Sequence, residues 1–270
     1  MVTFSASLSL CLYELPPVGS TPSKRIQSVR TIARAHDSPV HVCKADPTST
    51  YLASGSADSV VKVWDIHHGF VTHVFKGHGG VISALTFHFP YDASSLEMPI
   101  MRLITASVDT HIRIFNLTSS ASKSADGKPE AVLEGHVSVP RGLDISRDGR
   151  WLISAGRDSV VLIWDLSSKG SSSQLKKPST RSMRPVLAKT IPVLERTEAV
   201  GFLPADQEIP AAVKNKANLR FFTGGSGCKI KIWDAQSGEV LWKSGEDIEG
   251  EDESRQITDI LCVFTWLNLP

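Results

Sequence analysis

The chain has 270 residues, of which 41% are hydrophobic, so it is long enough to bury a sizeable core as one domain. Its formal net charge of +1 provides no overall attraction to nucleic acid or to a membrane surface, so any partner must be recognised locally. The four cysteines stand singly, without the spacing of a metal site or of a disulfide framework, and they predict free thiols in a reducing compartment.

The two ends of the chain argue against a membrane protein. Residues 3–15 have no basic region, and Leu8, Leu10 and Leu12 alternate with smaller residues, which predicts a strand rather than a signal peptide. Residues 257–269 are apolar but too short to span a bilayer. We therefore expect a soluble, intracellular chain.

An aromatic residue followed by a polar or acidic one recurs at intervals of about 50 residues, a period that is typical of repeat proteins. An aspartate stands six positions before most of these aromatic residues, a Ser or Thr stands ten positions before, and a histidine lies further upstream. The sets are His36, Ser54, Asp58 and Trp64; His78, Thr105 and Asp109 with Phe115; and His136, Ser154, Asp158 and Trp164. The pairs Tyr13-Glu14 and Trp233-Asp234 share this phase.

Between these markers, β-branched and aromatic runs such as 51–54 and 60–64 predict pairs of strands. The pattern resembles the blades of WD40 β-propellers. The predicted fold is all-β, with about four blades near residues 36–78, 78–133, 136–194 and 197–244.

The resemblance also implies a structural role for the recurring residues, because in WD40 proteins the His, Ser or Thr, Asp and Trp form a buried hydrogen-bonded tetrad. Leaving one member of such a network unpaired costs roughly 1 to 3 kcal/mol. The second set is incomplete because Phe115 has no N–H to donate. In the fourth repeat, Thr197 is aligned with the histidine and Gly227 with the aspartate, so we expect packing alone to hold that blade.

A hydrolase triad is the catalytic alternative for the His, Ser and Asp sets. Three equivalent sets at equivalent strand positions are typical of a scaffold, and no nucleophile elbow, phosphate-binding loop or clustered metal site accompanies them. We therefore predict a protein that is not an enzyme, with no cofactor, no metal and no small-molecule substrate.

The organisation outside the blades follows from composition. Polar insertions at 91–99, 119–129, 167–185 and 205–218 predict mobile surface loops. The basic loop 167–185 is read as a solvated linker, with RNA contact or a nuclear address as the alternative. Half-blades are predicted at both ends, so residues 1–261 are interpreted as a partial propeller and 262–270 as a non-native tail, with unpaired sheet edges that promote self-association.

Several phrases resemble one family in particular, the transducin-beta-like WD-repeat subunits of the small-subunit processome. The phrases include Gly79-Gly80 after the histidine, and residues 5–15, 35–40, 133–139 and 189–195. The resemblance implies a non-catalytic scaffold in nucleolar small-subunit ribosome biogenesis and pre-rRNA processing. Its implied partners are other WD40 subunits of the UTP-B subcomplex and, indirectly, the U-three snoRNP and pre-rRNA.

The rival interpretation is a generic WD40 adaptor, such as a substrate receptor of a cullin-RING ubiquitin ligase. Those receptors often carry Arg three residues after the Trp, where this chain has His67, Thr118, Ser167 and Gln236. Direct RNA binding would require a basic stripe with exposed aromatic side chains.

Candidate contact residues lie before the tetrad aspartate and at the start of the first strand of a blade. There the chain offers Arg157, Val108, His41 and Arg141. Arg157 is the strongest candidate because arginine is enriched at interface hot spots, although a solvated loop residue is the simpler interpretation.

Overall fold

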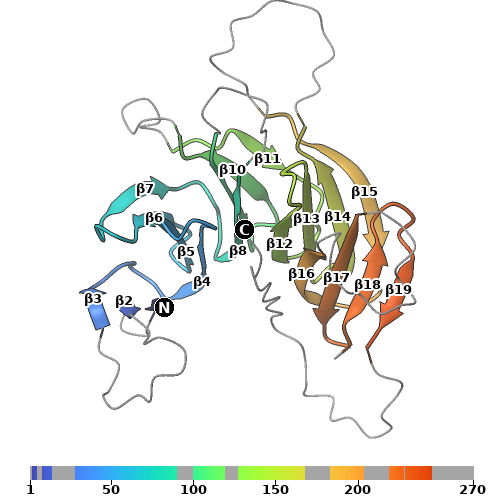
Figure 1. Cartoon of the computed structure of the whole chain (residues 1–270), viewed down its shortest axis with the longest axis horizontal. Helices are drawn as coiled ribbons and strands as arrows, with labels where there is room; N and C mark the ends of the chain where they lie inside the picture. The colour runs from blue at the N-terminus through green and yellow to red at the C-terminus, as the bar shows by residue number, and fades with distance from the viewer. Residues whose placement is uncertain are drawn as a thin grey trace, which may run out of the picture. The chain divides into compact units, whose positions relative to one another are not determined.

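A computed structural model describes residues 2–4, 8–13, 28–89, 100–118, 127–167, 183–203, 219–227 and 229–244. In these residues every regular element is a strand, and the all-β prediction is confirmed (Figure 1). No helix in this part of the chain is long and apolar enough to cross a membrane. The chain divides into two compact units, Met1–Glu134 and Gly135–Pro270.

The first unit contains three antiparallel sheets, each with its strands in chain order. A three-stranded sheet consists of β1 (Val2–Phe4), β2 (Leu10–Tyr13) and β3 (Ser28–Ile32). Blade 1 consists of β4 (Val40–Ala45), β5 (Tyr51–Ser56), β6 (Val61–Asp65) and β7 (Val71–Phe75). Blade 2 consists of β8 (Ile82–His88), β9 (Arg102–Ser107), β10 (Ile112–Asn116) and β11 (Ala131–Leu133).

The second unit contains two four-stranded antiparallel sheets of the same design. Blade 3 consists of β12 (Pro140–Ile145), β13 (Trp151–Gly156), β14 (Val160–Asp165) and β15 (Val186–Pro192). Blade 4 consists of β16 (Thr197–Leu203), β17 (Arg220–Gly225), β18 (Lys231–Asp234) and β19 (Val240–Lys243). The four predicted blades are therefore present.

Each unit has a core between two neighbouring blades, because the inner strands are apolar on both faces. In the first unit, Val63 and Phe75 of blade 1 share a cluster with Ile82 and Phe115 of blade 2. The blades approach so closely that a Cβ on Gly55 would lie 2.4 Å from Cγ2 of Ile82. The second unit repeats this packing with Ile153, Ile163 and Ile191 against Val200, Phe202 and Trp233.

The first strand of every blade carries a β-bulge. The register skips one residue between Val40 and Val42, and the equivalent residue is skipped in the other three blades. The bulged residues are His41, Ser83, Arg141 and Glu198. A bulge re-aims its side chain and often occurs beside a functional site.

Two predictions about the ends have different outcomes. The N-terminal sheet has three strands rather than half a blade. The strand predicted at 257–261 and the tail 262–270 lie outside the described residues, as does most of each predicted loop.

Candidate functional site

The polar tetrads form in blades 1 and 3 with nearly identical geometry. In blade 1, His36 Nε2 lies 2.8 Å from Ser54 Oγ, His36 Nδ1 lies 3.1 Å from Asp58 Oδ2, and Trp64 Nε1 donates to Ser54 Oγ over 2.9 Å. In blade 3, the corresponding distances among His136, Ser154, Asp158 and Trp164 are 2.8, 2.7 and 3.0 Å.

The donors and acceptors of this network match one protonation state. A carboxylate only accepts, so His36 Nδ1 carries the proton, and its Nε2 accepts from the Ser54 hydroxyl. The hydroxyl oxygen is then free to accept from Trp64. Burial lowers the pKa of His36 despite the neighbouring Asp58, which keeps the imidazole neutral at pH 7.

The tetrad aspartate also builds the turn between the second and third strands. In blade 1, the amides of Asp37 and Val60 donate to the Asp58 carboxylate over 3.2 and 2.9 Å. The next residue is left-handed in three blades, with φ of 65° at Ser59, 69° at Thr110 and 62° at Ser159. Such a backbone is strained for residues other than glycine, and the aspartate hydrogen bonds hold it in place.

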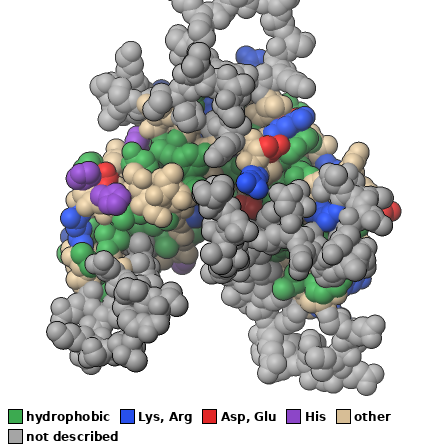
Figure 2. Space-filling view, in the orientation of Figure 1, with side chains coloured by type: hydrophobic (Ala, Val, Ile, Leu, Met, Phe, Trp, Pro, Cys, Tyr) green, Lys and Arg blue, Asp and Glu red, His purple; other side chains and the backbone are tan. Residues whose placement is uncertain are grey.

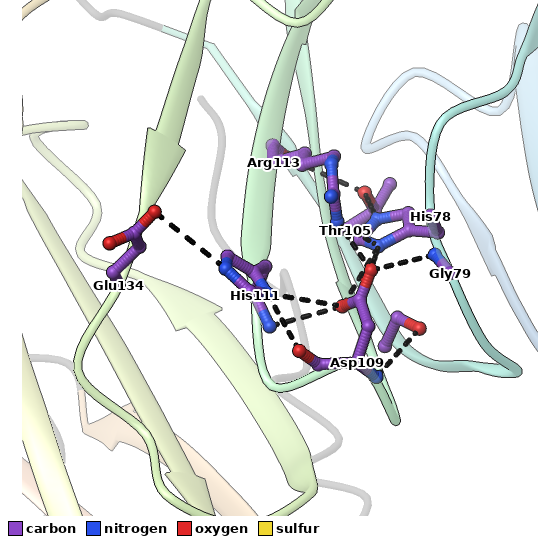
Figure 3. Close-up of polar contacts among 8 residues, drawn as sticks. His78, Gly79, Thr105, Asp109, His111, Arg113 and Glu134 are labelled. Carbon is purple, nitrogen blue, oxygen red and sulfur yellow. Dashed lines mark hydrogen bonds and ion pairs between the residues drawn. The ribbon is translucent and has the colours of Figure 1, made fainter.

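Blade 2 lacks the tryptophan and has an arginine within the network (Figure 3). His78 Nε2 lies 2.8 Å from Thr105 Oγ1, and its Nδ1 lies 3.1 Å from Asp109 Oδ2. Arg113 Nη1 lies 2.7 Å from the same carboxylate oxygen and 2.6 Å from His78 Nδ1. Phe115 is buried and stacks on Phe75 with ring centroids 4.3 Å apart, so packing replaces the missing hydrogen bond.

The charges of blade 2 follow from burial and from Arg113. Burial lowers the pKa of His78 to about 4. The negative charge of Asp109 raises this pKa, whereas the positive charge of Arg113 lowers it further. Burial opposes ionisation of Asp109, but hydrogen bonds from the amides of Gly79 and His111, together with His78 and Arg113, outweigh it and lower its pKa to about 2. At pH 7 this network therefore contains a neutral histidine between an arginine cation and a carboxylate.

Blade 4 corrects two sequence-based expectations. Thr197 pairs with Gly225 in blade 4 as Val40 pairs with Ser56 in blade 1. The tetrad histidine of blade 1 lies four residues before Val40, and the residue four before Thr197 is the buried Val193. Val193, and not Thr197, therefore replaces the histidine. The expectation that packing alone holds this blade is also wrong, because Trp233 Nε1 donates to Thr223 Oγ1 over 2.9 Å.

Blade 4 also has a carboxylate at the turn between its second and third strands, but it belongs to Glu195, which precedes the first strand of the blade. Glu195 Oε2 accepts from the amide of Gly227 over 3.1 Å, and its Oε1 lies 2.7 Å from Lys231 Nζ. Gly227 stands where the aspartate of the other blades stands, and a Cβ there would lie 2.3 Å from the Glu195 carboxylate. The glycine therefore makes room for the replacement.

The distances in the tetrads are those of a serine hydrolase, but their surroundings are not. Ser54, Thr105 and Ser154 are fully buried. Each of the two serine hydroxyls forms hydrogen bonds with both a histidine and a tryptophan. A substrate carbonyl has no route to a hydroxyl in this position. Within the described ranges, no group of three or more His, Cys, Asp or Glu side chains has the arrangement of a metal site.

The four candidate contact residues differ in their environments. Arg141 and Arg157 converge on Glu198, with Nε to carboxylate distances of 2.6 and 3.1 Å. His41 is exposed, and Val108 is 45% exposed. Sequence reasoning did not find Glu198, because it lies 57 residues from Arg141 in another blade and no periodic pattern marks it. Figure 2 shows basic and acidic side chains scattered among hydrophobic ones, in keeping with the net charge of +1.

Comparison with known families identifies the repeats. The WD domain, G-beta repeat model matches residues 26–65, 69–116 and 127–165. The matched segments end on Asp65, Asn116 and Asp165, each of which follows the aromatic residue of its blade. Blade 4, whose network departs from the pattern, lies outside the matched residues.

Comparison with curated proteins gives relatives of named function. Rat transducin beta-like protein 3 is 34% identical over 78% of this chain and 23% of its own length. The yeast U3 small nucleolar RNA-associated protein 13 is 31% identical over 78% of this chain and 22% of its own length. A nuclear distribution protein PAC1, from Arthroderma otae, is 28% identical over 73% of this chain. The chain thus spans less than a quarter of the length of the first two relatives. It contains three WD40 repeats and is similar, over most of its sequence, to the transducin beta-like and U3 small nucleolar RNA-associated proteins.

Proposed function

We propose that this chain is a non-catalytic WD40 scaffold in ribosome biogenesis, which acts in pre-rRNA processing within the small-subunit processome of the nucleolus. The observation that carries the proposal is its similarity to the yeast protein whose name records association with U3 small nucleolar RNA. The identity to that protein and to rat transducin beta-like protein 3 is 31% and 34%, above the 28% found for the nuclear distribution protein.

The geometry supports a scaffold over an enzyme. The polar side chains that could carry out chemistry are used to fix strand register, and their hydroxyls are buried. No cofactor and no small-molecule substrate are part of the proposal. Its partners are other WD40 subunits of the processome, with the U3 snoRNP and pre-rRNA reached indirectly.

In each unit, the candidate surface for these contacts is the edge where the first strand of a blade begins. Arg157, Arg141, His41 and Val108 lie there and are at least partly exposed. An adaptor of a ubiquitin ligase is the second candidate, and the absence of arginine at His67, Thr118, Ser167 and Gln236 disfavours it.

Affinity purification with quantitative mass spectrometry tests the proposal. The tagged full chain is expressed in cells of its source, nuclear extract is prepared, and an unrelated WD40 protein with the same tag is the matched control. We expect processome subunits to be enriched over the control. Enrichment of cullin-RING ligase subunits instead would support the second candidate and contradict the proposal.

A further inference from the structure

Two arginines and one glutamate form an ionic cluster at the edge between blades 3 and 4. Arg141 is the bulged residue of β12, Arg157 follows β13, and Glu198 is the bulged residue of β16. Glu198 Oε2 accepts from Arg141 Nε over 2.6 Å, and its Oε1 accepts from Arg157 Nε over 3.1 Å. The glutamate side chain is 5% exposed, whereas those of Arg141 and Arg157 are 37% and 49% exposed. The charge that faces solvent is therefore positive.

The fold does not require this cluster. The same edge between blades 1 and 2 has His41 and Ser83 as the bulged residues and Ala57 in the place of Arg157. Ala57 and Arg157 occupy equivalent positions because they form equivalent backbone hydrogen bonds: Ala57 N donates to Pro39 O, and Arg157 N donates to Val139 O. Two blades thus pack at that boundary with neutral or small residues in these positions, so the arginines are not needed for blade packing.

Glu198 orients the arginines without using all their donors. Each arginine binds the glutamate through Nε, and none of their terminal Nη groups donates to a residue in the described part of the chain. A guanidinium is well suited to bind a second carboxylate through two parallel hydrogen bonds. The shared glutamate holds two such groups in place, which lowers the entropy lost when an anion binds.

Exposed aliphatic residues lie at the same edge of this unit. Val137 is 87% exposed, and its amide donates to Asp158, the residue after Arg157. Leu194 stands at the equivalent position of the next blade, and it is 90% exposed. In the first unit, the corresponding positions are occupied by Asp37 and Gly79. This edge therefore combines two partly exposed arginines with two exposed aliphatic side chains.

We propose that Arg141 and Arg157 form a docking point for an acidic protein segment, in which a glutamate or aspartate binds the guanidinium groups and neighbouring apolar residues contact Val137 and Leu194. The aliphatic neighbours favour a peptide over a nucleic acid, because RNA would present phosphates and bases to them. This inference rests on the proposed scaffold function and names the class of partner that this edge recognises.

Fluorescence anisotropy tests the docking point directly. The full chain is titrated into a fluorescein-labelled twelve-residue peptide that contains glutamates interspersed with leucines, and separately into the same peptide with glutamine in place of glutamate. We expect binding of the acidic peptide only, and a loss of about tenfold in affinity for Arg157→Ala and for Arg141→Ala. Arg157→Lys should retain part of the affinity, because it keeps the charge but not the paired hydrogen bonds.

Arg150→Ala is the matched control. Arg150 precedes β13 and Arg157 follows it, so the two lie at opposite ends of one strand with similar exposure, 45% and 49%. The control should bind like the unmodified chain, and Arg157→Ala should keep its melting temperature because blade 1 folds with Ala57. Equal losses at both arginines, equal binding of the glutamine peptide, or arginine-dependent binding of an oligouridine in preference to the peptide would each overturn the proposal. Peptide binding without co-purification of processome subunits would refute the scaffold function alone.

Discussion

Replacing Asp158 with alanine should destabilise the second unit by roughly 2 to 4 kcal/mol. The carboxylate is 1% exposed and accepts from His136 Nδ1 over 2.7 Å and from the Val137 amide over 3.2 Å. Its removal leaves a buried imidazole N–H without an acceptor, which costs roughly 1 to 3 kcal/mol. It also removes support from the left-handed Ser159, with φ of 62°. The melting temperature should fall by roughly 5 to 15 °C.

Asp165→Ala is the control, because it removes a carboxylate from the same blade in a partly solvated place. Asp165 is 23% exposed and pairs with Arg150 over 3.1 Å. Its loss should cost less than about 1 kcal/mol. Urea unfolding followed by tryptophan fluorescence gives both values. Similar losses for the two variants would refute the tetrad as the device that holds the blade.

Four further outcomes follow from the networks. Trp164→Phe should cost about 1 kcal/mol, because Ser154 Oγ loses one donor at 3.0 Å. Ser154→Ala should lower stability while hydrolysis of activated esters stays at background in both proteins, because the hydroxyl is buried. Glu195→Gln should cost roughly 2 to 4 kcal/mol in urea unfolding, because it leaves the Lys231 cation, 18% exposed, without its 2.7 Å partner. Because His78 has a folded pKa of about 4, below its unfolded value of 6.5, its contribution to stability is full above pH 6.5 and falls by about 2 kcal/mol between pH 7 and pH 5.

Each of these has a result that contradicts it. An unchanged midpoint for Trp164→Phe would mean that the indole contributes by packing alone. Ester turnover that disappears in a folded Ser154→Ala variant would show an active site. Full stability of Glu195→Gln would remove the proposed replacement for the aspartate in blade 4. A stability that is flat from pH 7 to pH 5, or unaffected in its pH dependence by His78→Gln, would reject a neutral buried histidine.

Blades 1 to 3 could be predicted from sequence because their hydrogen bonds require fixed spacings. Ser54 lies ten residues before Trp64, since both belong to one hairpin in which Leu52 is paired with Trp64. The same spacing recurs in blade 3 between Ser154 and Trp164. Side chains that must meet across a tight hairpin leave a periodic signal that is visible in one sequence.

The network of blade 4 could not be predicted from the sequence, for a physical reason. The likeness of residues 193–195 to 132–134 suggested that Thr197 replaces the histidine, whereas strand pairing assigns that place to Val193. The segment 204–218, between β16 and β17, prevents counting back from Trp233. The cluster of Arg141, Arg157 and Glu198 could not be predicted from the sequence either, because it depends on bulges in two separate strands.

Association of the chain with the U3 small nucleolar RNA is the most direct test of the proposed scaffold function. The tagged full chain, and an unrelated tagged WD40 protein as the control, are immunoprecipitated from nuclear extract, and the U3 RNA in each precipitate is measured by quantitative reverse-transcription PCR. We expect clear enrichment of U3 RNA over the control. We also expect a reduced yield for Arg157→Ala, because that docking point would contact a protein subunit of the particle. U3 RNA at the level of the control, with the chain folded and localised to the nucleus, would contradict the proposed function in the small-subunit processome.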